Sequence, residues 1–264
     1  MPRTQPALED VRRPAPRGLG LKGRRLDTRQ FLVTAEHASN HIPSQYKGLG
    51  LTGGQLQAHI AWDPGAKAIA RATARTLGCP CHEGSHSRLL IDLNRSPHHR
   101  KLIARESFSI PIPGNASVSR DERDRRIRLY YTPFREAVLA DVRRIIRAHG
   151  QCVHISMHSF TPVVDGVNRK GDFGILYDPS RRLESALAAN LIDLMASEGF
   201  HARRNYPYRG TNDGHTTGLR ALFPASRYVG LEVEVNQRIL QTGSEIRHVA
   251  TKIAAAVGLV AGAK

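Results

Sequence analysis

The stretch that decides the fold is TPFREAVLADVRRIIRAHGQCVHISMHSFTP, residues 132–162. Its first part places apolar side chains on one face at helical spacing, and Gly150 follows as a stop signal. Thr132 and Pro133 are typical of a helix start, with Thr132 as the N-cap. The second part, CVHISMH at 152–158, predicts a buried strand. A helix followed directly by a buried strand indicates an α/β fold.

The same alternation continues on both sides of this stretch. We expect strands over 31–36, 87–94, 173–178, 201–205 and 228–236, and helices over 63–78, over 179–198 and after Ser244. This order predicts a three-layer α/β/α sandwich on a mixed, mostly parallel sheet. The polar stretch from Arg95 to Ser119 is long for an ordinary connection, which is typical of a functional lid. Ligands of such sheets gather at the carboxyl ends of the strands.

Charge and composition divide the chain into two parts. Residues 1–28 are rich in Pro, Gly and Arg and predict a disordered basic arm, whereas residues 29–264 predict a single domain. Lys and Arg exceed Asp and Glu by 39 to 23, which gives a net charge of +16. Such a charge attracts phosphates, so nucleic-acid binding has to be considered. The arginines are spread along the chain with few aromatic residues between them and no recognised binding module, which argues against a nucleic-acid partner.

Other features indicate a soluble protein. No apolar run approaches the roughly 18 residues that a membrane span needs, and the N-terminus has no apolar signal core. The three cysteines do not form a disulfide framework and fit a reducing compartment. We therefore expect no membrane partner and a cytoplasmic location.

Reactive side chains gather where the predicted strands end. Such charged groups are costly to bury unless they are paired or bound to a metal, so we expect them to converge on one site. They are Glu36, His37, Asp92, Asn94, Arg95, His158, Ser159, Glu232 and Glu234.

Three of the polar residues form a candidate metal set. His37, Asp63 and His158 supply two histidines and one carboxylate, and catalytic zinc commonly takes three such ligands. A lone histidine after an apolar strand is more often a packed core residue, so the case for His158 depends on its neighbours. Asp63 precedes a proline, and an N-cap of the next helix explains it equally well.

Further residues suit an acidic substrate. Glu232 and Glu234 alternate on one strand and point to the same face, so one of them could be a general base. Asn94 and Arg95 could grip a carboxylate, although a surface salt bridge to Asp92 or Glu83 explains the pair equally well. The loop NYPYRGTNDGHTTGLR, residues 205–220, is dense in polar and aromatic groups typical of ligand binding, and equally of a plain connection.

Seven segments in series carry a family resemblance. They are AEHASNHIP, HIAWDPGA, SRLLIDLNRSP, HSFTP, GDFGILYD, NYPYRGTNDGHTT and GLEVEVNQ, and the match covers nearly everything from Phe31 to Gln237. In this order and spacing the chain resembles the N-formylglutamate amidohydrolase family. That family is distantly similar to zinc carboxypeptidases and aspartoacylase-like amidohydrolases, so the resemblance implies a zinc-exopeptidase or phosphorylase/hydrolase-like fold.

The resemblance also implies roles for single residues. It implies that His37 and His158 are zinc ligands, that Asn94 and Arg95 clamp the substrate carboxylate, and that Glu234 is the base. The relatives place a Glu three residues after the first histidine, where this chain has Asn40. We therefore take Asp63 rather than Glu36 as the third ligand. Additional substrate contacts are expected from Arg169, Arg209 and His215.

The implied function is metal-dependent hydrolysis of the amide bond in an N-acyl acidic amino acid. N-formyl-L-glutamate, cleaved to formate and glutamate, is the named example, with one zinc ion per chain, a small anionic substrate and a place in amino acid catabolism. AEHASN differs from the PHSG form of the family, so the acyl group stays open, as does the oligomeric state. The alternatives are a zinc peptidase acting on short or cell-wall peptides, and a nucleic-acid-binding protein on a hydrolase fold.

Overall fold

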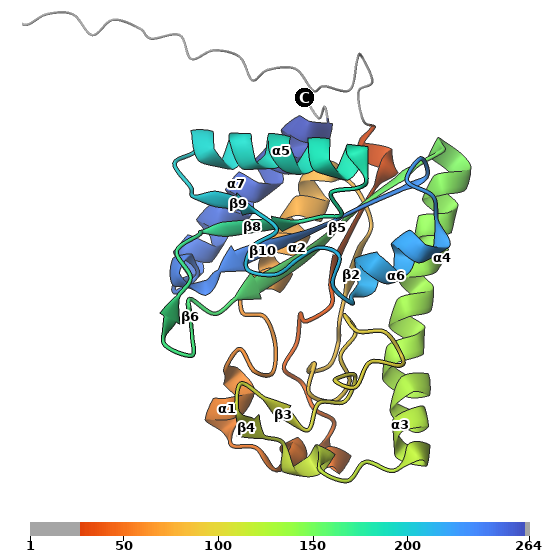
Figure 1. The fold of residues 1–264 in the computed structure, drawn as a ribbon, viewed down its shortest axis with the longest axis vertical. Helices are drawn as coiled ribbons and strands as arrows, with labels where there is room; N and C mark the ends of the chain where they lie inside the picture. Colours follow the sequence, from red (N-terminus) through yellow and green to blue (C-terminus); the bar gives the residue numbers. More distant parts are fainter. Residues whose placement is uncertain (1–26, 262–264) are drawn as a thin grey trace, which may run out of the picture.

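The computed structural model describes residues 27–261, whose central feature is a sheet of six strands in the order β2-β1-β5-β10-β8-β9 (Figure 1). β8 is antiparallel to β10, and the other neighbours are parallel, so the sheet is mixed and mostly parallel as predicted. The strands are β1 Phe31–Ala35, β2 Cys81–Glu83, β5 Cys152–Phe160, β8 Phe173–Leu176, β9 Ala202–Arg204 and β10 Tyr228–Asn236. The predicted arm, 1–28, lies outside the described residues except for its last two positions. The single domain stays a prediction.

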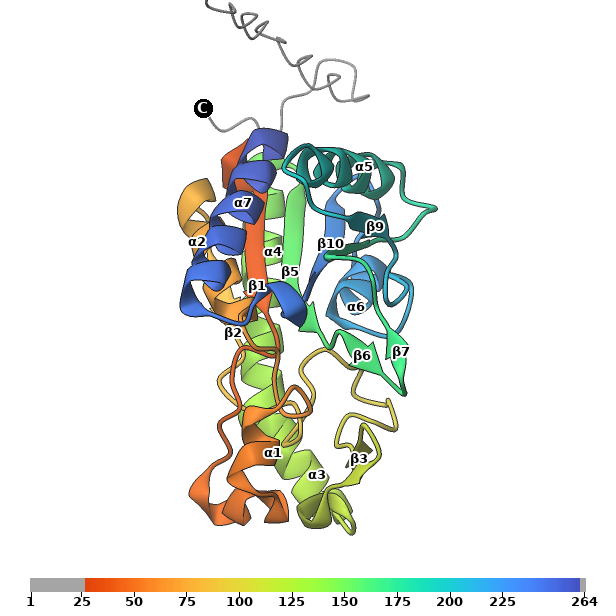
Figure 2. The same cartoon turned by 90° about the vertical axis from the view of Figure 1, so that its left-hand side faces the viewer.

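Helices cover both faces of the sheet, which confirms the three-layer sandwich (Figure 2). α2, α5 and α7 pack on the face that carries Phe31 and Val33 of β1. α4 and α6 pack on the opposite face, where Leu32 and Tyr228 lie. Across residues 27–261 no helix is long and apolar enough to cross a membrane. The helices are α1 Gly53–Gln57, α2 Ala66–Leu77, α3 Arg120–Arg126, α4 Thr132–His149, α5 Arg182–Ser197, α6 His215–Leu222 and α7 Gly243–Ala261.

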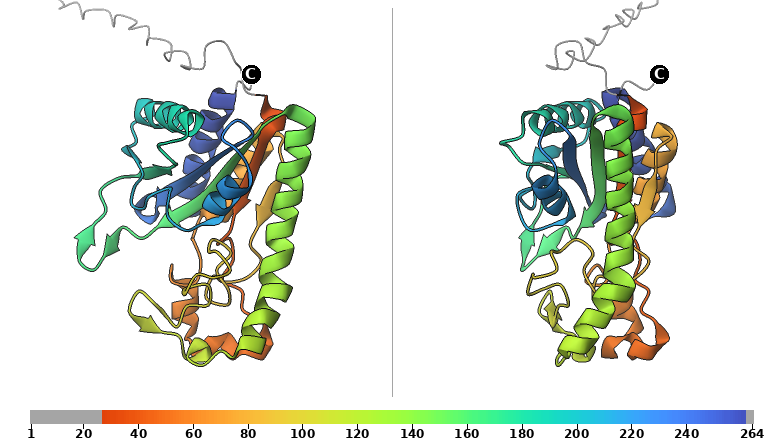
Figure 3. Two further views of the ribbon diagram at one scale, coloured as in Figure 1. Left: turned by 45° about the vertical axis from the view of Figure 1, so that its right-hand side comes forward. Right: turned by 90° about the vertical axis from the view of Figure 1, so that its right-hand side faces the viewer.

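α3 and α4 form one continuous column, joined by a π-helical turn over Ile127–Tyr131 (Figure 3). α4 begins at Thr132, but the prediction of Thr132 as an N-cap is wrong, because its backbone is helical and continues the π-helical turn. The N-cap is Ser119, whose hydroxyl accepts a hydrogen bond from the backbone N–H of Glu122. Pro133 has no N–H to donate to the preceding turn, and the π-helical turn lies immediately before it.

Loops with short helices and hairpins cover the carboxyl edge of the sheet. They include α1 and the hairpin of β3 Glu106–Ser107 and β4 Ile110–Pro111, below the sheet in Figure 1. A second small hairpin pairs β6 Val163–Val164 with β7 Val167–Asn168. The predicted strand at 87–94 is wrong: these residues form turns, and β2 is the strand that pairs with β1.

The apolar residues of 87–94 are buried without pairing in a sheet. Leu89 packs in a cluster with Leu49, and Ile91 in another with Leu102. The apolar residues of 87–94 therefore indicate burial in the core, but not a strand. Residues 215–222, expected to be part of a loop, form α6.

Candidate active site

The site lies on the face of the sheet that α4 and α6 cover, where the strands change from apolar to polar toward their carboxyl ends. Because side chains alternate along a strand, His154, Ser156 and His158 of β5 all point to this face. The sheet register pairs Ser156 with Glu232 and His158 with Glu234 of β10. The three buried strands β1, β5 and β10 therefore bring the polar side chains at their carboxyl ends close together.

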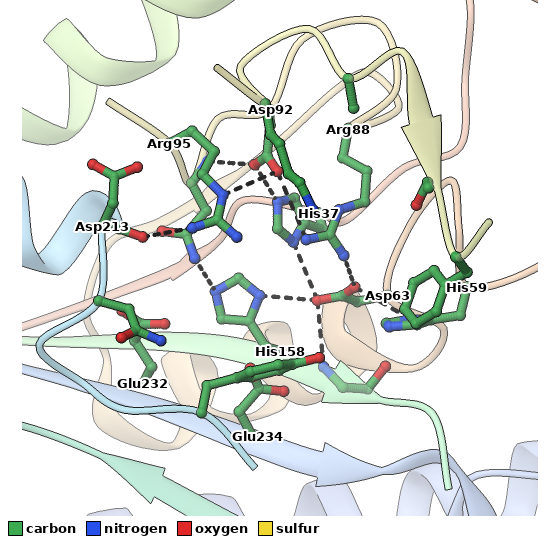
Figure 4. Close-up of a pocket in the computed structure, with 18 of the residues that line it drawn as sticks. His37, His59, Asp63, Arg88, Asp92, Arg95, His158, Asp213, Glu232 and Glu234 are labelled. Carbon is green, nitrogen blue, oxygen red and sulfur yellow. Dashed lines mark hydrogen bonds and ion pairs between the residues drawn. The ribbon is translucent and has the colours of Figure 1, made fainter. Parts of the chain in front are cut away.

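The structure brings the three predicted metal ligands together (Figure 4). One nitrogen of His37, one nitrogen of His158 and one oxygen of Asp63 lie within 4.8 Å of one another. Nδ1 of His158 is 2.9 Å from Asp63 Oδ2, and Nδ1 of His37 is 3.3 Å from the same oxygen. All three residues are buried. Two imidazoles and a carboxylate that converge in this way are a donor set suited to zinc.

Asp63 does not cap the following helix. α2 begins at Ala66 with Gly65 as its N-cap, and no side chain donates or accepts a capping hydrogen bond there. The carboxylate turns instead toward the two histidines and toward Arg88, whose Nη1 lies 3.0 Å from Asp63 Oδ1. Burial would raise the pKa of Asp63, but His37 and Arg88 outweigh it and hold that pKa well below its usual range.

Arg88 and Asp92 form a second layer around these ligands. Asp92 Oδ1 lies 2.7 Å from Nε2 of His37, on the ring nitrogen that faces away from Asp63. Arg88 Nη2 approaches Asp92 Oδ2 at 3.7 Å while Nη1 holds Asp63. Burial alone would raise the pKa of Asp92, but His37 and Arg88 lower it. One guanidinium thus fixes both carboxylates that flank His37.

Glu234 is the buried carboxylate beside the triad. Its Oε2 is buried and has no hydrogen-bond partner within the described part of the chain. Burial raises the pKa of Glu234 to about 7, with His158 acting in the opposite direction. Its neighbour Glu232 is held by Thr216, whose hydroxyl donates to Glu232 Oε1 at 2.5 Å.

Two predicted substrate contacts are engaged inside the protein. Asn94 Oδ1 accepts a hydrogen bond from the backbone N–H of His215 at 2.7 Å, and its Nδ2 lies 3.4 Å from His158 Nε2. His215 is fully buried, with Nδ1 2.8 Å from Glu36 Oε1. Neither Glu36 nor His215 lines the pocket. Asn94 and Glu36 approach Nε2 of His158, the ring nitrogen that faces away from Asp63, and His215 contacts both of them.

The predicted arginines differ in their position. Arg95 lines the pocket and donates to the backbone oxygen of Asp213 at 2.8 Å. Arg209 also lines the pocket and is exposed. Arg169 does not line it: its guanidinium packs on Phe160 and on Tyr208, and Tyr208 lines the pocket.

The pocket has a volume of about 350 Å³ and mixed charge. A divalent cation would balance its excess of two carboxylates, whereas the net charge of the whole chain is not concentrated here. Its walls also include His59 and the aromatic rings of Phe108 and Tyr208. The charged lining residues are four cations, Arg88, Arg95, Lys101 and Arg209, and six acids, Asp63, Asp92, Glu106, Asp213, Glu232 and Glu234.

Comparison with known families agrees with this geometry. The N-formylglutamate amidohydrolase family model matches residues 29–240, which include the triad, Glu234 and most of the sheet. The chain belongs to the N-formylglutamate amidohydrolase family. It is therefore a hydrolase acting on amide bonds. No curated protein matches the chain.

Two solved structures share the fold of this family member. Gene product Atu2144 from Agrobacterium tumefaciens is 32% identical, with a TM-score of 0.78 over 88% of this chain and 90% of that one. N-formylglutamate amidohydrolase from Ralstonia eutropha JMP134 is 18% identical, with a TM-score of 0.70 over 91% of this chain and 95% of that one. At the lower identity the likeness shows the fold alone.

Sequence reasoning missed several residues of this family member's pocket. Arg88, His59 and Phe108 carried no signal of their own, because an arginine, a histidine or a phenylalanine in a loop is common on any surface. An arginine four residues before Asp92 was the one available hint for Arg88. Asp92 was noticed as a partner for Arg95, and its shorter contact is with His37.

Proposed function

We propose that this chain is a metal-dependent hydrolase that cleaves the amide bond of an N-acyl acidic amino acid, with N-formyl-L-glutamate as the first candidate. The convergence of His37, Asp63 and His158 beside Glu234 carries this proposal. Family membership supplies the reaction class, and the donor atoms favour zinc.

The metal would be held by Nδ1 of both histidines and by Asp63, the atoms that face one another. When bound, it would supply a Lewis acid that polarises the substrate carbonyl and makes a water molecule more acidic. The excess of carboxylates in the pocket and the unpartnered Oε2 of Glu234 are features that a cation and a reacting water would satisfy.

Glu234 is the group placed to move protons. Its carboxylate takes a proton from the attacking water and passes it to the leaving nitrogen, so that the carbon–nitrogen bond breaks with a neutral amine as product. Glu234 is buried beside His158, Asp63 and Glu232 and also lines the pocket, so it can reach a water molecule bound there. Arg88 keeps Asp63 and Asp92 in place through both halves of its guanidinium.

The substrate carboxylates would be held by basic side chains of the same pocket. Arg95 and Arg209 line the pocket together with Lys101, and a guanidinium can grip a carboxylate with two parallel hydrogen bonds. Asn94 also lines the pocket, and its side-chain amide contacts His215 and His158, so it would help to orient the site. Its contact with the substrate carboxylate stays a prediction.

A substrate panel with controlled metal content tests the proposal. N-formyl and N-acetyl derivatives of acidic and neutral amino acids are assayed with zinc and with chelator, beside short peptides and with His158→Ala as the blank. We expect about one zinc per chain, loss of activity with chelator, and preference for N-acylated acidic amino acids. Activity of the metal-free protein would refute the metal dependence. Faster hydrolysis of peptides than of N-acyl amino acids would show that the substrates are peptides.

A further inference from the structure

Glu36 is a buried carboxylate that the proposed reaction does not use. Its side chain has no exposed surface, and each of its oxygens contacts two polar groups. Burying a carboxylate is costly unless its oxygens are hydrogen-bonded, so this cluster must serve a purpose. The partners are Thr34 Oγ1 at 2.8 Å, His215 Nδ1 at 2.8 Å, Ser156 Oγ at 2.5 Å and His158 Nε2 at 3.4 Å.

The shortest hydrogen bonds around Glu36 can be given a direction. An ionised carboxylate accepts and does not donate, so the Ser156 hydroxyl donates to Glu36. The Ser156 oxygen is then free to accept, and Nε2 of His158 lies 2.9 Å from it. A proton on Nε2 of His158 pairs with this oxygen, the closer contact, whereas the amide nitrogen of Asn94 lies 3.4 Å from Nε2. Nδ1 lies 2.9 Å from Asp63 Oδ2, to which an N–H there donates, and a bound metal would take the place of that proton.

The other branch of the cluster follows the same logic. The Thr34 hydroxyl donates to Glu36, so its oxygen accepts from Nε2 of His154 at 2.8 Å. Nδ1 of His154 then accepts from the Tyr228 hydroxyl at 2.7 Å. Each donor in this buried chain meets an acceptor, which supports the direction assigned from Glu36.

We propose that Glu36, acting through Ser156, is the positioning residue that orients His158 and keeps its proton on Nε2, so that Nδ1 can bind the metal. The inference rests on the proposed function because it takes His158 as a metal ligand. Asp92 serves His37 in the same way by direct contact. A carboxylate or other polar group behind a ligating histidine is a general requirement of metal sites.

Zinc affinity measured by competition with a chromogenic chelator tests this role without measuring activity. Glu36→Gln keeps the size of the side chain but presents an amide donor to groups that are already donors. Ser156→Ala removes the link and leaves Glu36 in place. We expect each variant to bind zinc about 10–100-fold more weakly. Glu36 acts on His158 through Ser156, so the two substitutions should not add. The double variant should therefore bind zinc no more weakly than the single variant with the lower zinc affinity.

Thr34→Val is the matched control. It also removes a hydroxyl that donates to Glu36, but Thr34 has its other contact with His154 and not with His158. Zinc affinity should stay unchanged in this variant. In the zinc-loaded wild type, NMR should detect a slowly exchanging, low-field proton on Nε2 of His158. Thr34→Val should preserve this signal, and Ser156→Ala should lose it.

The possible outcomes separate the two proposals. If the wild type binds no zinc, the metal-dependent function fails and the role of Glu36 fails with it. If the wild type binds zinc and both Glu36→Gln and Ser156→Ala bind it equally well, only the role of Glu36 is overturned. If Glu36→Gln does not fold, Ser156→Ala with its proton signal decides. Equal losses in Thr34→Val and Ser156→Ala would show a structural effect and reject the positioning role.

Discussion

Asp92 Oδ1 lies 2.7 Å from Nε2 of His37, on the opposite side of the ring from the nitrogen that faces Asp63. A carboxylate at this place makes Nε2 the donor and leaves Nδ1 free for a metal. Because Arg88 approaches both Asp92 and Asp63, the orientation of one histidine depends on three charged side chains. The geometry of the metal site therefore depends on Asp92 and Arg88 as well as on the ligands themselves.

Asp92→Asn should weaken zinc binding about 10–100-fold while the fold is retained, because an amide no longer fixes the proton on Nε2 of His37. Chelator competition and circular dichroism measure the two properties. Asp141→Asn is the control: Asp141 lies 2.8 Å from Nε2 of His82 and does not line the pocket, so zinc affinity should not change. Wild-type zinc affinity in Asp92→Asn would contradict the orienting role.

Glu234→Gln should lower kcat by about 10²–10⁴-fold and leave KM and zinc content near the wild-type values, because the amide cannot take up a proton. Steady-state kinetics with metal analysis of the same sample provide the measurement. Glu184→Gln, which changes another buried glutamate paired with Arg220, should affect stability but not kcat of the folded enzyme. A Glu234→Gln enzyme with undiminished kcat would exclude Glu234 as the base.

Much of the site was visible in the sequence because parallel strands bring their carboxyl ends to one edge. His37, His158 and Glu234 each follow an apolar run, and the triad meets as that rule implies. Asp63 stayed open because Asp-Pro is equally typical of a helix start. The question is answered by where α2 begins, at Ala66, and by the contacts of the carboxylate.

The parts that sequence could not give depend on distant neighbours. Glu36 and His215 are 179 positions apart, and no local pattern pairs them. The run at 87–94 has the apolar content of a strand, but its apolar side chains are buried in two small clusters outside the sheet. Thr132-Pro133 is a typical helix start signal, but here a π-helical turn ending at Tyr131 joins the helix to the one capped by Ser119.

Arg209→Ala should raise KM for N-acyl acidic amino acids and change kcat little, because the lost contact holds the substrate and not the reacting atoms. A hydrogen bond to a charged group contributes about 1.5–3 kcal/mol, which corresponds to a rise of about 10–150-fold. KM for N-formylglutamine, which lacks the side-chain carboxylate, should change less. Arg182→Ala, at the exposed start of α5, is the control and should leave both constants unchanged. Equal effects on glutamate and glutamine substrates would remove Arg209 from recognition of the side-chain carboxylate.

His154 should make the protein less stable in acid. Burial lowers the pKa of His154 to about 3, whereas in the unfolded chain a histidine has a pKa near about 6.5. Between these values the unfolded state binds the extra proton, so stability is complete above about pH 6.5 and falls as the pH decreases, by up to about 1.4 kcal/mol per pH unit.

The matched comparison is His154→Gln, which keeps hydrogen-bonding groups near Thr34 and Tyr228 and has no proton to gain. Urea unfolding at pH 7.5 and pH 5.5 measures the two free energies for each protein. Other buried histidines contribute equally to both proteins, so the difference between their pH slopes isolates His154. We expect the variant to be less stable at pH 7.5 but to lose less stability on going to pH 5.5. Equal losses in both proteins would show that His154 does not stay neutral in the folded state.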